Sequence, residues 1–362
     1  MQRRAIPRAL SALTIAAAAT ALVSCGGDGD DRVKIGSVTV FGDSLSDVGT
    51  YGVATGNAAN PGRFTVNPGQ VWTQNVAAHY RLEVTPYRSL TMDRQASSGA
   101  TDEDGTATVV GGNGYAEGGA RVAKRPSVSG VGNNQLVAPV REQVEQYLAS
   151  HDRFPKDSLV LVSGGANDIY AQFSTLCWDT DENNLGPGNT THDIAAANIA
   201  ETAQSVVAMI EQIRASGARV IVLLLQSEPT ASPFWRHYGE PQYQATGCST
   251  AVPPAERVGW ARAFNDIVRD GLVNLPEVIL VDAATVWADV LAQPSRYGLV
   301  NTTDAGCTNT EPTSSAVFCT EDTLVAADAA RTYLWSDDFH PSPRGHEILS
   351  DHALTLLQHV AR

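Results

Sequence analysis

Four short runs of apolar residues recur along the chain and predict buried strands. The runs are continuous rather than alternating, which is typical of strands in a parallel sheet that is covered on both faces. They lie at Val38–Phe41, Leu159–Val162, Val220–Leu225 and Val278–Val281. Because parallel strands need long crossover connections, helices are expected between them.

Apolar residues between these runs return every three or four positions, as on a helix with one buried face. The clearest stripe predicts a core-facing helix, for which Gly217 is a suitable stop; its members are Ala196, Ile199, Ala203, Val206, Ile210 and Ile213. Further helices are expected at Val140–Leu148, Ala255–Leu272 and Gly345–Leu357. Strands that alternate with helices predict a three-layer α/β/α sandwich with a mainly parallel central sheet.

Three stretches between these elements are rich in small and polar residues. Residues 50–135, 226–253 and 294–335 contain much glycine, proline, asparagine or serine. We expect them to be long surface insertions on one domain, built around a site.

Composition and charge exclude two classes of protein. The chain has 362 residues and a formal net charge of −14, and 43% of its residues are apolar. This length allows one large domain or two small ones, and it is ample to bury a core. An acidic chain without a basic track is not expected to bind nucleic acid. No apolar run reaches the roughly 20 residues of a membrane-spanning helix, so a polytopic membrane protein is not expected.

The N-terminus has the pattern of a targeting signal. Three arginines within the first eight residues precede a short apolar stretch at Ala9–Ala21. Leu22–Cys25 then resembles a bacterial lipobox, in which cleavage precedes a cysteine that is acylated. We therefore expect a signal peptide over 1–24, a lipidated Cys25 with a flexible tether over 25–34, and export to the bacterial envelope, at the outer membrane. The alternative is an ordinary secretory signal with an incidental cysteine.

The other four cysteines predict two disulfides. In an exported protein Cys177, Cys248, Cys307 and Cys319 can pair in three ways. We favour Cys307 with Cys319, which only eleven residues separate, and Cys177 with Cys248. No C-x-x-C pair or suitably spaced histidine accompanies them, so no metal site is expected.

A serine near the start of the chain and a histidine near its end could act together. Ser44 follows the first predicted strand, at the sheet edge where ligands bind. Read alone, its Gly-Asp-Ser context is also ordinary turn chemistry. A serine hydroxyl needs a base such as His340, and that imidazole needs an acceptor on its other nitrogen. Asp337 is the favoured acceptor, and Asp338 is the alternative.

Two further segments could supply hydrogen-bond donors to a developing oxyanion. Asn167 follows the second predicted strand and should lie at the same sheet edge as Ser44. The glycine-rich segment 111–120 offers backbone amides.

Taken together, these segments resemble the conserved blocks of the GDSL, or SGNH, hydrolase superfamily, in that family's order. The blocks are Gly42–Asp47, Gly118–Ala120, Gly165–Asp168 and Asp337–His340. The resemblance spans roughly residues 36–360 and is nearest to the outer-membrane and autotransporter esterases. It implies a flavodoxin-like SGNH-hydrolase fold and one catalytic domain over 35–362.

The resemblance also implies roles for individual residues. Ser44 is the nucleophile, His340 is the base and Asp337 orients the base. The backbone amides of Ser44 and Gly119 and the side chain of Asn167 form the oxyanion hole. The family needs no cofactor and no metal. Two details stay open: Gly118 is adjacent to Gly119, and a role of Asp47 in bracing the Ser44 loop is not assigned.

The expected activity is that of a serine ester hydrolase which cleaves carboxylic esters, either acyl lipids or short-chain esters. A polyester depolymerase or polysaccharide deacetylase would use the same triad, and a non-catalytic surface-binding lipoprotein is the alternative of another class. Six aromatic residues could line an acyl groove or could equally be buried within the insertions: Trp72, Tyr80, Trp178, Phe234, Trp235 and Tyr243.

Overall fold

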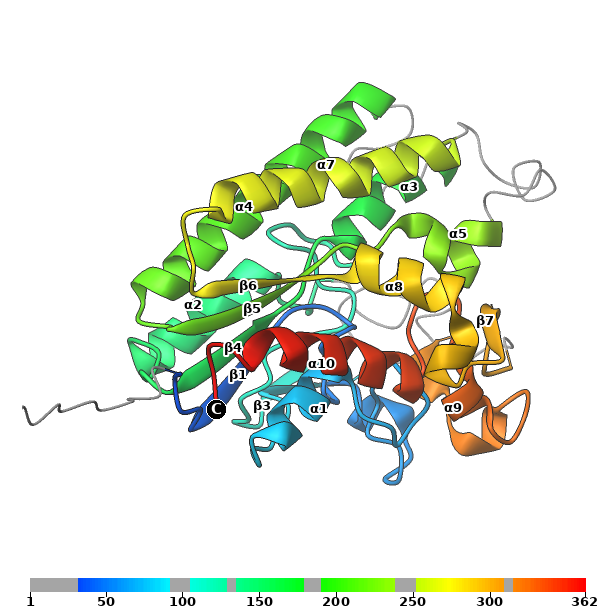
Figure 1. Cartoon of the computed structure of the whole chain (residues 1–362), viewed down its shortest axis with the longest axis horizontal. Coiled ribbons are helices and arrows are strands. Elements are labelled where there is room, and N and C mark those ends of the chain that lie inside the picture. The colour runs from blue at the N-terminus through cyan, green and yellow to red at the C-terminus, as the bar shows by residue number, and fades with distance from the viewer. Residues whose placement is uncertain (1–31, 92–104, 129–134, 179–189, 238–251, 309–314) are drawn as a thin grey trace, which may run out of the picture. The chain divides into compact units, whose positions relative to one another are not determined.

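Four parallel strands form the central sheet, in the order β1-β4-β5-β6 (Figure 1). They are β1 (Ser37–Phe41), β4 (Ser158–Val162), β5 (Val220–Leu225) and β6 (Val278–Asp282), so all four strand predictions are confirmed. The structure is a computed structural model. It describes residues 32–91, 105–128, 135–178, 190–237, 252–308 and 315–362, which belong to a compact unit, Arg32–Arg362.

Alternate residues of each strand face two separate cores, which makes the three layers predicted from the sequence. Val160 and Val162 of β4 belong to one core, with α2 (Val140–His151), α3 (Ala166–Trp178), α4 (His192–Ala215) and α7 (Pro254–Leu272). Leu159 and Leu161 face the other, with α1 (Trp72–His79), α8 (Ala283–Ala292) and α10 (Pro343–Leu357). These two groups of helices lie on opposite faces of the sheet in Figure 1. The α/β/α sandwich and the helices expected within α2, α7 and α10 are confirmed.

The stripe on α4 is correct except at its first member. Ala196 is exposed and Ala195 is buried in its place, because the buried face steps back four residues from Ile199. The helix ends at Ala215, and Gly217 follows with a positive φ of 105°. This left-handed conformation is available to glycine without a steric cost.

The prediction that 50–135 and 294–335 are surface insertions is wrong for much of both stretches. The first contributes α1, which packs against α10, and fully buried side chains such as Trp72. It also forms a hairpin of β2 (Arg88–Leu90) and β3 (Ala107–Val109). The second contains a parallel pair, β7 (Asn301–Ala305) and β8 (Tyr333–Trp335). These stretches look loop-like because their apolar residues are isolated among glycine and proline.

Short helices complete the described structure. They are η1 (Val53–Thr55), η3 (Pro229–Ala231), α5 (Pro233–His237), η4 (Pro294–Tyr297), η5 (Ala316–Phe318), η6 (Glu321–Thr323) and α9 (Ala329–Thr332). Within the ranges given above, no helix has the length and apolar character needed to cross a membrane.

Cys307 and Cys319 form a disulfide, and Cys177 is also disulfide-bonded. Its expected partner, Cys248, lies outside the described residues, as do Cys25 and the expected signal peptide over 1–24. The folded unit begins before the end of the expected tether, because the amide of Val33 donates to the carbonyl of Val360 and that of Arg362 donates to Val33. The two described ends of the chain are therefore held together.

Candidate active site

The turn after β1 presents Ser44 and is fixed by backbone geometry. Gly42 has a φ of +152°, and a Cβ atom there would lie 2.3 Å from the hydroxyl oxygen of Ser163. The side chain of Gln143, on α2, holds the same glycine from both sides: Oε1 accepts from the Gly42 amide at 2.8 Å, and Nε2 donates to the Gly42 carbonyl at 2.9 Å. Only glycine fits this position, and its orientation is locked by a helix 101 residues away.

Ser44 and His340 meet across 296 residues of sequence. The imidazole Nε2 lies 2.9 Å from the Ser44 hydroxyl oxygen. On the other side of the ring, Nδ1 lies 2.8 and 3.0 Å from the two carboxylate oxygens of Asp337. The three side chains expected to form a triad are thus in hydrogen-bond contact, with Ser44 8% exposed.

Asp337, rather than Asp338, contacts the imidazole. Its carboxylate accepts from the amides of Phe339 (2.8 Å), His340 (2.6 Å) and Ala316 (2.7 Å). Burial alone would raise the pKa of Asp337, but the neighbouring His340 and these hydrogen bonds lower it below its usual value. The group therefore stays ionised, as the orienting acid requires.

The candidate oxyanion donors lie on adjoining loops. Asn167 is the second residue of α3, and its side-chain amide donates one hydrogen to the carbonyl of Ala120 at 2.9 Å. The second hydrogen of the amide can serve an oxyanion. The amide of Gly118 donates to Asp47 at 2.8 Å and is therefore occupied. Among the described residues no acceptor takes the amide of Gly119 or that of Ser44. The structure thus favours Gly119 over Gly118 as the donor.

Asp47 links the nucleophile loop to the glycine loop. One of its oxygens accepts from the amides of Gly49 and Thr50, and the other accepts from Gly118. Burial raises its pKa to about 6 despite these bonds. Its role as a brace, which the sequence left open, is a direct consequence of this geometry.

A second buried network of hydrogen bonds holds the turn after β1. Asp43 accepts from the hydroxyl of Ser163 at 2.8 Å, and Ser46 lies 2.8 Å from the same hydroxyl. The indole of Trp72 donates to Ser46 at 3.1 Å. Trp72 is fully buried, so of the two alternatives left open for it, a groove residue or a buried residue of the insertions, the structure supports the second.

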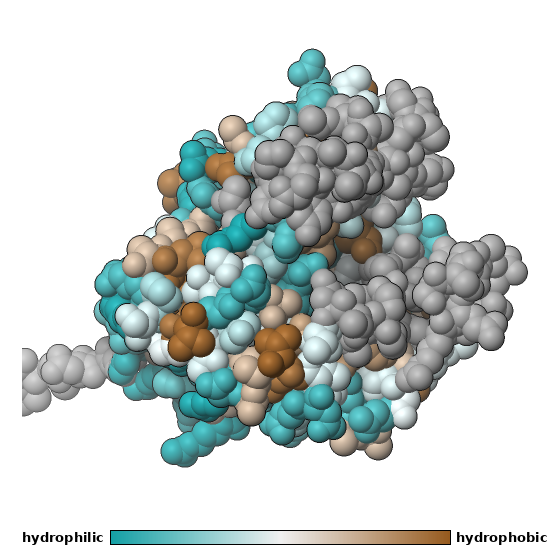
Figure 2. Space-filling view, turned by 90° about the vertical axis from the view of Figure 1, so that its right-hand side faces the viewer, coloured by the Kyte–Doolittle hydropathy of each residue, from teal (hydrophilic) through white to brown (hydrophobic). Residues whose placement is uncertain are grey.

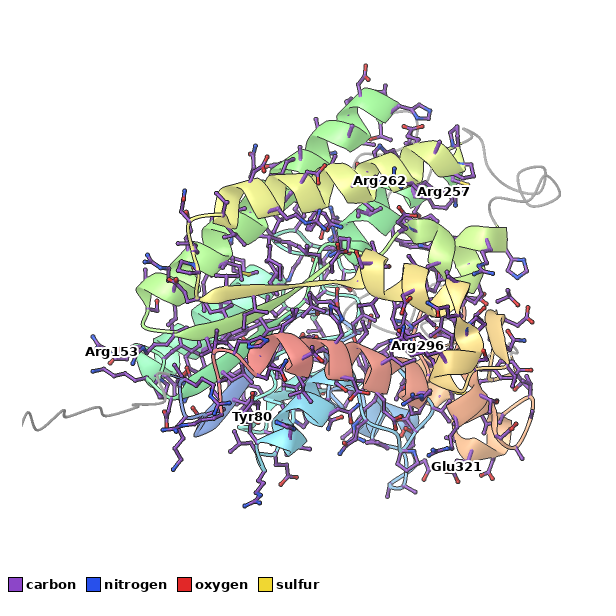
Figure 3. All side chains as sticks on the ribbon, in the orientation of Figure 1. Tyr80, Arg153, Arg257, Arg262, Arg296 and Glu321 are labelled. Carbon is purple, nitrogen blue, oxygen red and sulfur yellow. A yellow bond between two sulfur atoms is a disulfide. The ribbon has the colours of Figure 1, made fainter. Side chains whose placement is uncertain are left out.

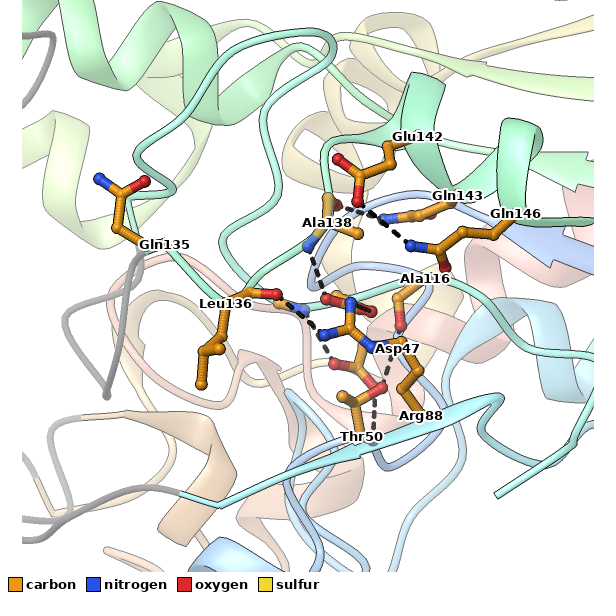
Figure 4. Close-up of polar contacts among 12 residues, drawn as sticks. Asp47, Thr50, Arg88, Ala116, Gln135, Leu136, Ala138, Glu142, Gln143 and Gln146 are labelled. Carbon is orange, nitrogen blue, oxygen red and sulfur yellow. Dashed lines mark hydrogen bonds and ion pairs between the residues drawn. The ribbon is translucent and has the colours of Figure 1, made fainter. Parts of the chain in front are cut away.

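Sequence reasoning missed three residues that hold these loops, Gln143, Glu117 and Arg88. Glu117 accepts from Arg88 and from the amide of Ala138, each at 2.8 Å. Figure 4 shows Arg88 reaching the carbonyl of Leu136 as well. Burial raises the pKa of Glu117 to about 7. Their partners are mostly backbone atoms distant in sequence, so no motif could reveal them.

Aromatic rings surround the histidine. Phe64 lies 4.9 Å from the imidazole, between ring centroids. Phe339, Phe234 and Tyr170 pack against one another beside it. Of the other groove candidates, Trp235 joins this group, and Tyr80 packs against the opposite core. The Trp178 side chain and Tyr243 lie outside the described part of the structure.

Figure 2 looks onto the face at the carboxyl ends of the strands, where the visible apolar residues are scattered among polar ones. Over the part of the chain that the structure describes, no group of three or more histidine, cysteine, aspartate or glutamate side chains could hold a metal ion.

A parallel-sheet sandwich that holds serine, histidine and aspartate in contact at its carboxyl edge has the architecture of a serine hydrolase. The model of the GDSL-like lipase/acylhydrolase family matches residues 38–353. The chain belongs to this family.

Two known proteins show more distant similarity. Lipase 1 of Photorhabdus luminescens is 34% identical over 80 residues, a match that spans 22% of this chain and 12% of that lipase. The crystal structure of an alpha/beta hydrolase enzyme from the metagenome of Lake Arreo, Spain, is 13% identical, with a TM-score of 0.40 over 90% of this chain and 97% of that one.

Proposed function

We propose that this protein hydrolyses carboxylic esters through an acyl-enzyme on Ser44, with acyl lipids or short-chain esters as substrates. The observation that carries the proposal is the 2.9 Å contact between His340 Nε2 and the Ser44 hydroxyl, with Asp337 on the other ring nitrogen. A neutral imidazole at this distance can take the hydroxyl proton.

In the first step, Ser44 Oγ attacks the ester carbonyl carbon while its proton moves to His340 Nε2. The carbonyl oxygen becomes an oxyanion, which the amides of Ser44 and Gly119 and the side chain of Asn167 stabilise. The intermediate then collapses, the bond to the alcohol oxygen breaks, and His340 gives its proton to that oxygen. Water repeats the sequence on the acyl-enzyme and releases the acid.

Asp337 acts through His340. Its carboxylate accepts from Nδ1, which fixes the tautomer that leaves Nε2 free to accept a proton, and it stabilises the imidazolium formed in each step. The three backbone amides that bind this carboxylate keep it aligned with the ring.

The test is hydrolysis of p-nitrophenyl esters of increasing acyl length by the protein and by Ser44→Ala. We expect Ser44→Ala to lose about 10⁴-fold or more in kcat. Ser150→Ala, at an exposed serine on α2, is the matched control. If Ser44→Ala kept a tenth of the wild-type rate, the nucleophile would be wrongly assigned. The chain-length series also ranks the substrate classes.

We propose in addition that Cys25 is acylated and holds the protein at the bacterial envelope, most simply the outer membrane. The support is the lipobox-like Leu22–Cys25 after an apolar stretch. Cells given labelled palmitate should label the wild type and not Cys25→Ser. Equal labelling of the two proteins would contradict the proposal.

A further inference from the structure

Arg257 is a buried cation without an anion. It lies near the start of α7 and is 0% exposed. Its Nη1 donates to the carbonyl of Trp235 at 3.3 Å, but Nε and Nη2 have no hydrogen-bond partner. Among the described residues no carboxylate forms an ion pair with it. Figure 3 places Arg257 and Arg262 on the same helix; Arg262, in contrast, pairs with Glu228.

A buried guanidinium with unpartnered donors lowers the stability of the folded protein unless an anion binds to it. A buried charge that lacks partners destabilises the folded protein, because its hydration is lost without compensation. Burial lowers the pKa of Arg257 to about 10, so the group is still a cation at neutral pH. Nε and Nη2 are neighbouring donors of the guanidinium fork, which can bind both oxygens of a carboxylate or two oxygens of a phosphate.

The surroundings of Arg257 are aromatic. Its guanidinium carbon lies 5.2 Å from the ring centroid of Trp235 and 5.6 Å from that of Phe173. The two aromatic rings interact with the guanidinium through their π faces. The edge of the guanidinium, which carries the N–H donors, stays available to an anion. The rings also offer an apolar wall to the part of a ligand next to that anion.

A row of rings connects this cation to the catalytic histidine. Trp235 lies 5.0 Å from Phe234, and Phe234 lies 4.3 Å from Phe339, between centroids. Phe339 directly precedes His340 and is 36% exposed. The amide of Phe234 donates to the carbonyl of Asp338 at 3.0 Å, which fixes α5 to the histidine loop. The row therefore begins at the exposed Phe339, next to His340, and ends at Arg257.

We propose that Arg257 binds a carboxylate or phosphate group at the far end of an apolar ester substrate whose carbonyl lies at Ser44. This inference rests on the proposed function and names its substrate class. The apolar part of the substrate lies along the Phe339–Trp235 row. Phe234 and Trp235 are each only 9% exposed, so the proposal requires their side chains to move when such a substrate enters.

The experiment compares two series of p-nitrophenyl esters, one of alkanoic acids and one of dicarboxylic acids with a free terminal carboxylate. At matched chain length we measure the ratio of kcat/KM for the anionic ester to that for the neutral ester. A chain of net charge −14 repels anions in general, so a ratio above one needs a local cation. We expect a ratio of about 10 to 100 at the length that spans the row. A third series that ends in a phosphate distinguishes the two anions.

The variants assign this preference to one side chain. Arg257→Met should bring the ratio to one or below, and Arg257→Lys, which keeps the charge without the fork, should give an intermediate ratio. Arg262→Met is the matched control on the same helix and should keep the wild-type ratio. A wild-type ratio of one or less at every length would overturn the inference, and so would an Arg257→Met protein that keeps the preference.

A thermal unfolding measurement excludes a purely structural arginine. If Arg257 awaits a ligand, Arg257→Met removes an uncompensated buried charge, and its Tm equals or exceeds that of the wild type. A lower Tm together with an unchanged ratio would show that the arginine pairs within its own chain, and would overturn the inference. Failure of the proposed function looks different, since the wild type would then hydrolyse no neutral ester.

Discussion

At the scale of single residues, the site separates groups that react from groups that hold them. Ser44 and His340 are the only members of the triad that change protonation in the proposed reaction, while Asp337 is held by four donors, three amides and one imidazole. Asn167 differs from all three, because it acts only on the charge that develops in the transition state.

Asn167→Ala removes the one side-chain donor of the proposed oxyanion hole. We expect kcat for p-nitrophenyl esters to fall about 100- to 1,000-fold, with a smaller change in KM, since the donor serves the transition state more than the ground state. Asn198→Ala, at a half-buried asparagine on α4, should keep its activity. Retention of more than about a tenth of the rate by Asn167→Ala would remove this residue from the site.

Asp337→Asn tests the pairing with His340 through the turnover rate. Without the carboxylate the imidazole loses the acceptor that fixes its tautomer and stabilises the imidazolium, so kcat for p-nitrophenyl esters should fall about 10⁴-fold. A variant that keeps the wild-type kcat would contradict the pairing.

At the scale of elements, the side chain of Gln143 connects helix α2 to the turn that follows strand β1. Gln143 both donates to and accepts from Gly42, as a neighbouring strand would, and is itself fully buried. The nucleophile turn is therefore positioned by α2, although this helix carries no reacting group.

Gln143→Leu should show that dependence. It leaves the buried amide of Gly42 without an acceptor, at a cost of about 1–3 kcal/mol in the free energy of unfolding. The turn also loses its alignment, so kcat should drop about 10-fold or more. Gln146→Leu, one turn further along α2, is the control and should change both quantities little. A destabilised Gln143→Leu protein with a full kcat would show that α2 supports the fold alone.

The elements also show what a sequence can and cannot reveal. Long apolar runs such as Val220–Leu225 need burial on both faces, so the sheet was predictable. Helix α1 was missed because it has only eight residues inside a glycine-rich stretch, and α3 because it directly follows the Gly165 motif.

The sequence motifs identified the residues that the structure brings together around His340. Two of the motifs, those of Ser44 and Asn167, follow strands of the central sheet and so end at one edge. They could not name Gln143, Glu117 or Arg257. These side chains act through backbone atoms, or through a lack of partners, and neither is visible in a linear pattern.

At the scale of the whole molecule, the stability of the fold depends on pH through carboxyl groups that are buried under the active-site loops. Burial raises the pKa of Glu117 to about 7 from 4.5. A group whose pKa is raised by folding favours the folded state fully below its unfolded pKa, and that contribution is lost as the pH rises through the folded value.

Glu117→Gln should therefore flatten the dependence of stability on pH. For the wild type, this residue contributes a loss of about 3 kcal/mol in unfolding free energy between roughly pH 4.5 and 7. The variant, which has no proton to lose there, should lack that decline even if the lost ion pair with Arg88 lowers its overall stability. Urea unfolding at several pH values measures both slopes, and equal slopes would mean that Glu117 titrates normally.

The pairing of Val33 with Val360 and Arg362 has a consequence for orientation. All four strands run in parallel, so Ser44 lies at their carboxyl end, while both described chain ends lie at the amino end (Figure 1). A group attached at Arg32 or Arg362 would thus stand at the pole opposite the nucleophile, and it would leave the approach of esters to Ser44 open.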